Sequence, residues 1–295
     1  MPVPRPASLV ALYHAVGTAR TTGYRDALDR EALARQLDWL AARYAVLPLG
    51  ELLRLRREGA PLAGLAAITF DDNHRSVLEL ALPLLAERGL PATWCLIGGV
   101  LAGRPYWRRQ VQSLIDRDEV GAFLAFAREQ DPAAISGIRP ERFYRDSKDP
   151  GRCRVPALMA LLDRFRPGGA DPALVRAEDL AGLAPLPGVT LANHSLTHPV
   201  FAGLSQAQQR EEVMLGRTAV AAVGWATVDV LALPFGGADS YDASLPAALA
   251  SAGCEAVLLT GSEGTAADDL SAHPALAGGP PTALVRVLLG SLTLD

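Results

Sequence analysis

The chain has 295 residues, of which 49% are hydrophobic and 20% charged, and its formal net charge is −4. This composition is too apolar for a disordered chain and not basic enough for a nucleic-acid-binding protein. Three well-separated cysteines without a CxxC pair argue against a disulfide scaffold and against a cysteine–zinc site.

Short apolar runs alternate with amphipathic helical stretches along most of the chain. In chain order, the predicted elements are a strand at 8–13, a helix at 30–44, a strand at 44–48, a helix at 51–58, a strand at 65–70, a helix at 77–88 and a strand at 92–97. Strands resume at 189–192, 227–233, 255–259 and 284–289, with helices at 206–223 and 245–252 between them. This alternation predicts a parallel α/β sheet, either open or closed into a barrel.

The segment from about 100 to 186 interrupts this alternation. It contains helical patches at 119–129 and 157–165 but no clear strand, and it is longer than a βα unit requires. We therefore predict a helical insertion. Residues 100–170 hold 13 Lys and Arg against 9 Asp and Glu, although the whole chain is acidic. The insertion either binds an anionic ligand or carries solvated arginines on its helix surfaces.

Two adjacent carboxylates, Asp71 and Asp72, follow the predicted strand at 65–70. Side chains at the C-terminal end of a parallel strand enter the ligand crevice of an α/β fold. Because adjacent carboxylates repel at close range, a metal ion that binds one of them relieves the conflict and leaves the other free as a base. The alternative is an acidic pair at a helix N-terminus.

Two of the five histidines, His194 and His198, follow the predicted strand at 189–192. Their spacing of four places both side chains on one face of a helical turn or tight loop, as metal ligands require. The alternative is a pair of solvated or core histidines. With one aspartate, two imidazoles form an open three-ligand site, which is typical of a hydrolytic metal centre.

These strings resemble the motifs of the polysaccharide deacetylase family (carbohydrate esterase family 4, with the nodulation-type deacetylase homology domain). TFDDN at 69–73 matches its TFDDG motif, HSLTH at 194–198 matches H-(S/T)-x-x-H, and LPFG at 233–236 resembles its proline–aromatic–glycine motif. The resemblance covers most of the chain except the insertion. It implies a single domain over 1–295, folded as a distorted (β/α) barrel of about seven strands with the helical insertion at about 100–186.

The resemblance also implies roles by position. Asp71 would be the general base, and Asp72, His194 and His198 would bind a divalent metal ion, zinc in the first place. The backbone N–H of Phe235 would stabilise the oxyanion of the reaction.

Three features depart from the family pattern. Asn73 stands where the family has glycine, and asparagine tolerates unusual backbone angles better than most residues. Ala232 stands where many members carry an arginine that orients the base. The Leu-x-His motif that supplies a catalytic-acid histidine in many members is missing near the C-terminus.

Two residues could take over the roles of the missing arginine and the missing histidine. Arg286 lies in an apolar, β-branched run, where a charge is costly unless it is paired. We expect it at the barrel mouth, paired with Asp71 as part of the catalytic machinery; the alternative is an exposed edge position. His14 closes the first strand and either faces the pocket, as an acid or a substrate contact, or is a hydrogen-bonded histidine without a catalytic role.

We expect the insertion to cover the C-terminal ends of the strands. Tyr106 and Trp107 would then offer a stacking surface to a sugar ring. Several of its arginines would face the pocket and attract a phosphate or another anion, namely several of Arg108, Arg109, Arg139, Arg142 and Arg145. The alternative is that Trp107 packs the insertion onto the barrel and the arginines are solvated.

The expected activity is metal-dependent hydrolysis of an acetyl group from an N-acetylated sugar or polysaccharide precursor, including phosphate- or lipid-linked sugars. Two alternatives stay open: a non-catalytic carbohydrate-binding protein on the same fold, and a hydrolase of C–N amide bonds outside carbohydrate. No nucleic-acid partner is expected. The N-terminus has no signal-peptide pattern, and no stretch approaches the roughly 18 apolar residues of a membrane span. We therefore expect a cytoplasmic protein.

Overall fold

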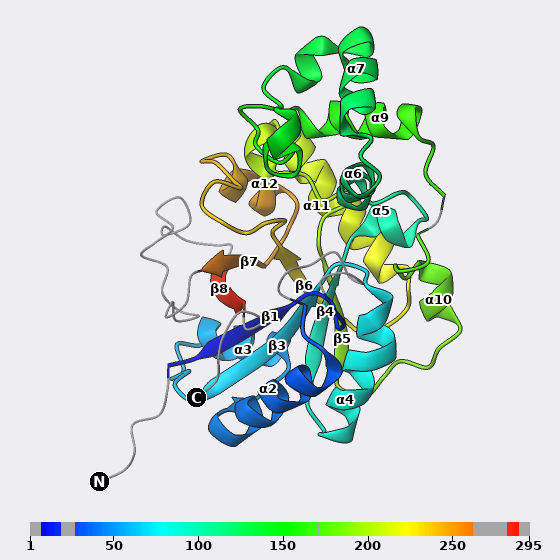
Figure 1. The fold of residues 1–295 in the computed structure, drawn as a ribbon. Helices are drawn as coiled ribbons and strands as arrows, with labels where there is room; N and C mark the ends of the chain where they lie inside the picture. The colour runs from blue at the N-terminus through cyan, green and yellow to red at the C-terminus, as the bar shows by residue number, and fades with distance from the viewer. Residues whose placement is uncertain (1–6, 19–26, 170, 262–281, 289–295) are drawn as a thin grey trace.

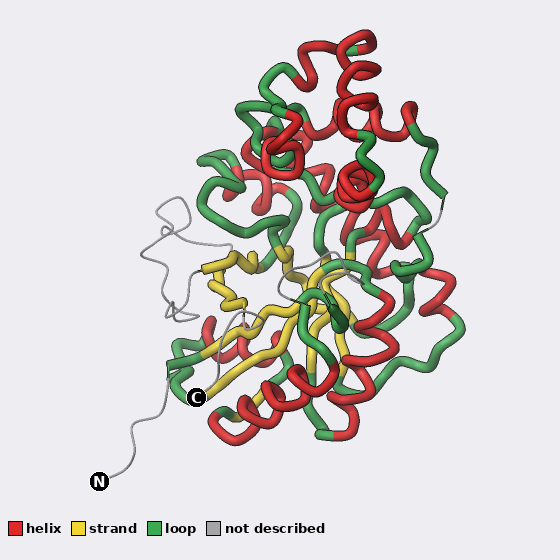
Figure 2. The backbone as a smooth tube through the Cα atoms, in the orientation of Figure 1, coloured by secondary structure: helices red, strands yellow, loops and turns green. Residues whose placement is uncertain are grey.

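A computed structural model describes residues 7–18, 27–169, 171–261 and 282–288. Its strands are β1 (Leu9–Tyr13), β2 (Ala45–Val46), β3 (Leu65–Asp71), β4 (Ala92–Leu96), β5 (Val189–Asn193), β6 (Thr227–Ala232), β7 (Ala256–Gly261) and β8 (Thr282–Leu288). Each predicted strand is present, although the predicted 44–48 strand shortens to the two residues of β2. Figure 2 shows the strands gathered at the centre, with helices around them.

The strands form one parallel sheet that closes on itself. Neighbouring strands pair in the order β1-β8-β7-β6-β5-β4-β3, and β1 also pairs with β3 through the register Leu9↔Ala66 to Tyr13↔Phe70. The ring therefore contains seven strands, and the short β2 pairs with the beginning of β3 outside it. Strands buried on both faces need continuous apolar sequence, which the fully buried LVALY of β1 provides. The predicted distorted (β/α) barrel of about seven strands is confirmed.

Helices cover the outside of the barrel. They are α2 (Arg30–Arg43), α3 (Leu49–Arg57), α4 (Leu82–Glu87), α11 (Gln206–Ala221) and α12 (Leu245–Ser251). Helix α2 begins where the Asp29 carboxylate accepts a hydrogen bond from the N–H of Ala32 at 2.7 Å. The predicted helix at 77–88 starts instead with a π-helical turn, Val77–Ala81, before α4. Pro83 lies just after this turn and has no N–H to give to a regular α-helical bond, which accounts for the irregularity.

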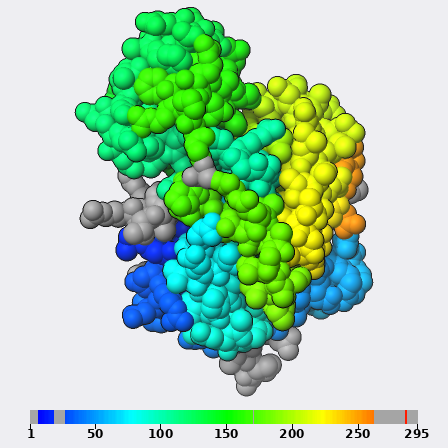
Figure 3. Space-filling model, turned by 90° about the vertical axis from the view of Figure 1, so that its right-hand side faces the viewer, coloured from blue at the N-terminus to red at the C-terminus, as the bar shows by residue number. Residues whose placement is uncertain are grey.

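The segment between β4 and β5 contains helices joined by turns, and no strand among its described residues, as the sequence predicts. It contains α5 (Gly98–Leu101), α6 (Trp107–Asp116), α7 (Val120–Gln130), α8 (Phe143–Asp146), α9 (Val155–Phe165) and α10 (Ala177–Ala181). Buried side chains such as Leu114, Phe123 and Leu158 give it a hydrophobic core of its own. Helices α6, α7 and α9 lie together beyond one end of the barrel (Figure 1), and their residues form a distinct lobe in Figure 3. Within the described residues, the structure has no helix with the length and apolarity that a membrane span requires.

Candidate metal centre

The predicted site residues meet at one end of the barrel. Asp71 is the last residue of β3, and His194 follows the last residue of β5, so both lie where parallel strands end. A pocket of about 200 Å³ opens there. It is lined by Leu12, His14, Asp71, Asp72, Tyr106, Arg108, His194, His198, Leu233, Phe235 and Thr260.

Asp72, His194 and His198 form a compact buried cluster. The Nε2 atoms of His194 and His198 lie 3.6 and 3.7 Å from Oδ1 of Asp72. One ligand atom from each residue lies within 4.8 Å of the other two, so the three side chains could hold one metal ion. The two-histidine, one-carboxylate donor set leaves further coordination positions for water and substrate.

The imidazoles are arranged as metal ligands require. Nδ1 of His194 lies 2.7 Å from the carbonyl oxygen of Ala232, which fixes the proton on Nδ1 and leaves the Nε2 lone pair facing Asp72. Burial, with His194 as a nearby imidazole, holds the pKa of His198 well below its usual range. Among the described residues nothing bonds to Nδ1 of His198. His198 is thus a neutral, buried imidazole whose Nε2 atom faces Asp72, as a metal ligand requires.

The barrel and the insertion both hold Asp72. The backbone carbonyl oxygen of Asp72 accepts a hydrogen bond from the indole N–H of Trp94 at 2.6 Å, and its carboxylate Oδ1 accepts one from the Tyr106 hydroxyl at 3.2 Å. Burial alone would raise the pKa of this carboxyl group, but the imidazoles of His198 and His194 lower it below its usual range. Asp72 is therefore an anion, as a metal ligand must be.

Strained backbone concentrates at this pocket. Of the five non-glycine residues with positive φ in the described chain, four lie in the two matched motifs or the LPFG loop, namely Asp72, Ser195, His198 and Phe235. Such conformations cost about 1–3 kcal/mol each and persist only where surrounding contacts impose them. The Ser195 hydroxyl is one such contact, because it accepts the N–H of His198 at 2.9 Å.

Asp71 has a different environment from its neighbour. Nη1 of Arg286 on β8 lies 2.5 Å from Oδ1 of Asp71, and both side chains are buried. Burial raises the pKa of Asp71, but the Arg286 guanidinium and the His194 imidazole outweigh it, so the pKa lies below its usual range. The predicted pairing of Arg286 with Asp71 is present. Position 232 holds an alanine where many family members carry an arginine, and Arg286 brings a guanidinium to Asp71 from a different strand, β8.

Asn73 stands where the family has glycine, which predicts an unusual backbone angle at this position, but the structure shows otherwise. The left-handed conformation belongs to Asp72, not to Asn73. The buried Asn73 amide instead accepts the N–H of Ile97 at 2.8 Å and donates to the carbonyl of Val175 at 3.3 Å. A glycine could make neither bond. Asn73 therefore links the end of β3 to both ends of the insertion.

Helix α11 supports the HSLTH loop from behind. The carboxylate of Glu212 accepts the N–H groups of Leu196 and Thr197 at 2.9 and 2.8 Å, and the Thr197 hydroxyl at 2.6 Å. Gly216 allows this close approach, because a Cβ there would lie 2.3 Å from Oδ1 of Asn193. Neither Glu212 nor Gly216 belongs to a recognised motif, so nothing in the sequence alone indicates these roles.

The insertion contributes directly to the pocket, but not as predicted for Trp107. Tyr106 and Arg108 line it, whereas Trp107 is buried and its indole N–H donates to the carbonyl of His198 at 3.0 Å. Its ring also packs beside that of Phe235, with 6.5 Å between centroids. Trp107 therefore offers no stacking surface to a sugar ring. It instead holds His198, a candidate metal ligand, in place.

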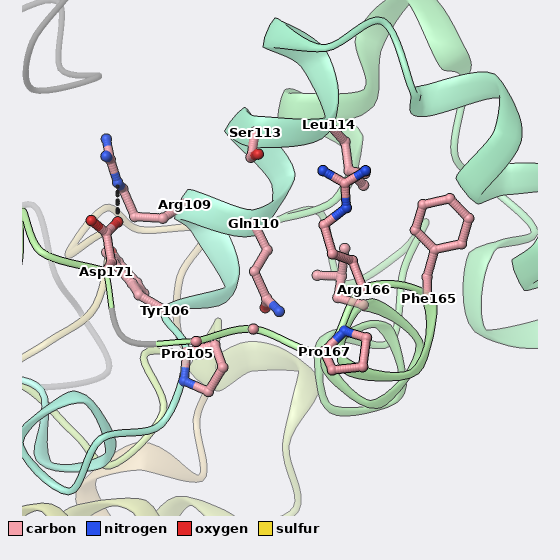
Figure 4. A pocket seen from close by; sticks show the side chains of 13 residues that line it. Pro105, Tyr106, Arg109, Gln110, Ser113, Leu114, Phe165, Arg166, Pro167 and Asp171 are labelled. Atoms are coloured by element: carbon pink, nitrogen blue, oxygen red, sulfur yellow. Dashed lines mark hydrogen bonds and ion pairs between the residues drawn. The ribbon is translucent and has the colours of Figure 1, made fainter.

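Most of the arginines expected in the pocket lie elsewhere. Arg109 pairs with Asp171 and lines a separate hollow between α6 and the end of α9 (Figure 4), which shares Tyr106 with the candidate site. Arg139 pairs with Asp146 at 2.8 Å. Arg142 and Arg145 are not among the lining residues of the pocket. Of the five, only Arg108 lines it.

The two remaining predicted residues, His14 and Phe235, line the pocket. His14 is close enough to both acidic groups to lower the pKa values of Asp71 and Asp72. Phe235 is half-buried, adopts φ 64° and lies 4.9 Å from His198 between ring centroids. Six of the eight predicted site residues therefore line the pocket, whereas Arg286 bonds to Asp71 without lining it and Trp107 lies behind it.

The chain is similar in sequence and fold to polysaccharide deacetylases. The family model described as polysaccharide deacetylase matches residues 59–121. The fold is similar to the Streptococcus pyogenes deacetylase PplD in complex with acetate (16% identity, 98% of this chain and 93% of that chain, TM-score 0.56). It is also similar to IcaB from Ammonifex degensii (18%, 98% and 93%, 0.56) and to the deacetylase domain of BpsB from Bordetella bronchiseptica (17%, 97% and 98%, 0.55).

None of the curated proteins matches the chain. The resemblance to the polysaccharide deacetylase family that the motifs predict is confirmed by the family-model match and by the shared fold.

Proposed function

We propose that this chain, which resembles polysaccharide deacetylases, is a metal-dependent hydrolase that removes the acetyl group of an N-acetylated sugar. The observation that carries the proposal is the pairing of two electrostatically distinct carboxylates at the barrel mouth. Asp72 faces two imidazoles that could share a metal ion with it, whereas Asp71 is bound by a guanidinium. A ligand set beside a separate base is what metal-assisted hydrolysis of an amide uses.

The protein residues divide the chemistry among them. Asp71 accepts a proton from the attacking water, and Arg286 holds this carboxylate ionised and oriented. The backbone N–H of Phe235 stabilises the negative charge that develops on the acyl oxygen. His14 lies in the same pocket and protonates the leaving amine, a role that the missing C-terminal motif leaves vacant. The amide and one water become acetate and a free amino sugar.

Asp72, His194 and His198 would hold the divalent ion, zinc in the first place. When bound, such an ion polarises the acyl oxygen and lowers the pKa of bound water to about 7 in favourable cases. Burial of the cluster strengthens these interactions, since the surrounding dielectric is low.

Acetate release from a panel of acetylated compounds tests the proposal. We expect release from N-acetylglucosamine oligomers and little from N-acetylated peptides or from cyclic amides. Release from the non-carbohydrate amides alone would move the activity to another class of C–N bond. Binding of the oligomers without any acetate release would instead indicate a carbohydrate-binding protein on this fold.

A further inference from the structure

Two cations of the insertion lie together beside the pocket without a carboxylate partner. The guanidinium carbon of Arg108 lies 4.8 Å from the centroid of the Phe235 ring, and Nζ of Lys148 lies 5.4 Å from it. Both also face the ring of Tyr144. Across the part of the chain that the structure describes, neither has an ion pair within 4.0 Å, although the charge of Asp239 is close enough to raise the pKa of Lys148. Lys148 is the only lysine of the chain.

This pair contrasts with five other arginines of the insertion. Arg109, Arg139, Arg152, Arg154 and Arg166 of the insertion each have a carboxylate partner, at distances from 2.5 to 3.1 Å. Arg108 and Lys148 are half-buried, and burial together with the charge of Arg108 lowers the pKa of Lys148. Like charges held together at a partly desolvated site repel, and a bound anion removes the repulsion.

The remaining charges of the pocket favour an anion beside Arg108. Arg286 offsets the charge of Asp71, and a divalent ion would more than offset that of Asp72. Arg108 is thus an uncompensated positive charge in the lining of the same pocket. The guanidinium and ammonium groups together match a phosphate, since the first binds oxygen atoms bidentately and the second acts as a point charge.

We propose that Arg108, supported by Lys148 beside the Phe235 ring, binds a phosphate group on the N-acetylated sugar. This inference rests on the proposed function and deepens it, because it predicts that a phosphate group on the N-acetylated sugar strengthens its binding. The aromatic rings of Phe235 and Tyr144 hold both cations in place through their faces.

Binding measured by calorimetry, without turnover, tests the inference. We expect N-acetylglucosamine 1-phosphate to bind at least about tenfold more tightly than N-acetylglucosamine, as charge-assisted bonds allow. R108Q should abolish this preference, and R108K should retain part of it. K148Q should reduce the preference by a smaller factor. R117Q, an equal charge change at the exposed C-terminal end of the same helix α6, should leave it unchanged.

Two outcomes overturn the inference. One is equal binding, or no binding, of the neutral sugar and its phosphate ester by the wild-type protein. The other is a preference that persists in R108Q with its fold intact by circular dichroism, because the phosphate then binds elsewhere, for example at a metal ion. N-acetylmuramic acid serves as a carboxylate probe, and a stronger Arg108-dependent preference for it would overturn the choice of phosphate.

Three phosphate esters of N-acetylglucosamine distinguish a lipid-linked substrate from a soluble one. UDP-N-acetylglucosamine, the free 1-phosphate and a decyl phosphodiester of the same sugar should all lose affinity in R108Q. Tightest binding of the decyl ester identifies a lipid-linked substrate, and tightest binding of either of the others a soluble one. A phosphate preference in a protein that releases no acetate would contradict the proposed function and leave this inference standing.

Discussion

At the residue scale, the adjacent carboxylates of Asp71 and Asp72 differ in the charged and polar groups that surround them. Asp71 is neutralised by a guanidinium from β8, and Asp72 faces the imidazoles of the HSLTH loop. The strained backbone at Asp72, with φ 64°, lets consecutive side chains enter the same pocket. A strand continuing through both residues would send them to opposite faces of the sheet.

Asp71→Asn should retain the metal ion and lose most hydrolysis. The substitution removes a proton acceptor but no ligand, and general-base catalysis contributes about 10²–10⁴-fold. Metal content by atomic emission and acetate release would be measured on the same sample. Asp72→Asn is the matched comparison and should lose the metal. The reverse pattern, with metal lost in Asp71→Asn alone, would show that the two roles are exchanged.

Arg286→Gln should destabilise the fold strongly. It leaves Asp71 as a buried, unpaired charge, and breaking one side of such a pair costs about 3–5 kcal/mol. The free energy of unfolding in urea at pH 7 measures this. Arg54→Gln breaks exposed pairs with Glu51 and Glu58 and should leave the free energy of unfolding almost unchanged, because solvent screens such pairs. Equal costs for the two variants would contradict a buried Asp71–Arg286 pair.

At the element scale, α11 acts as the support of the candidate ligand loop. Glu212 bonds three groups of that loop, and Gly216 lets the helix approach Asn193 and Ser195 within a distance that no side chain permits. The positions of His194 and His198 therefore depend on a helix that begins twelve residues after His194. Outer contacts of this kind orient the ligands of metal sites and tune their affinity.

Glu212→Gln should weaken metal binding without abolishing it. The amide keeps the shape of the side chain but cannot accept three hydrogen bonds as a carboxylate does, and loss of such support typically costs about 10–100-fold in affinity. Competition with a fluorescent zinc chelator gives the affinity. Glu211→Gln removes the neighbouring exposed carboxylate and should bind zinc as the wild-type protein does. Identical affinities in the two variants would refute the supporting role.

Asp146 secures α8 in the insertion. Its buried carboxylate accepts the side chain and the backbone N–H of Arg139, and the Arg139 guanidinium lowers its pKa from 3.8 to about 2. A pKa lowered in the folded state contributes stability above pH 3.8, and this stability is lost as the pH falls toward 2. Asp146→Asn should therefore reduce the free energy of unfolding at pH 7 by about 2 kcal/mol.

The difference between Asp146→Asn and the wild-type protein should disappear as the pH approaches 2. Urea unfolding at pH 7, 4 and 2.5 gives both curves. A difference that stays constant over this range would mean that the carboxylate contributes through packing and not through its charge.

At the scale of the whole molecule, the sequence predicts what depends on period and motif. Alternating apolar runs identify every ring strand, and the strand ends at Asp71 and Asn193 place the two motifs in one pocket. Contacts across the fold have no such signal. Trp107 looks like a stacking residue until α6 turns its indole onto His198, and Lys148 is separated by 40 residues from Arg108 beside it. Only the packing of the insertion on the barrel determines these positions.

The central claim is that one divalent ion at Asp72, His194 and His198 supports deacetylation at this pocket. The direct test removes metal with a chelator and follows acetate release from N-acetylglucosamine oligomers as zinc is titrated back. The account predicts that activity is lost on chelation, returns linearly and saturates at about one zinc ion per chain, as a single three-ligand site requires. Full activity after chelation, or zinc-restored activity in His194→Ala, would contradict it.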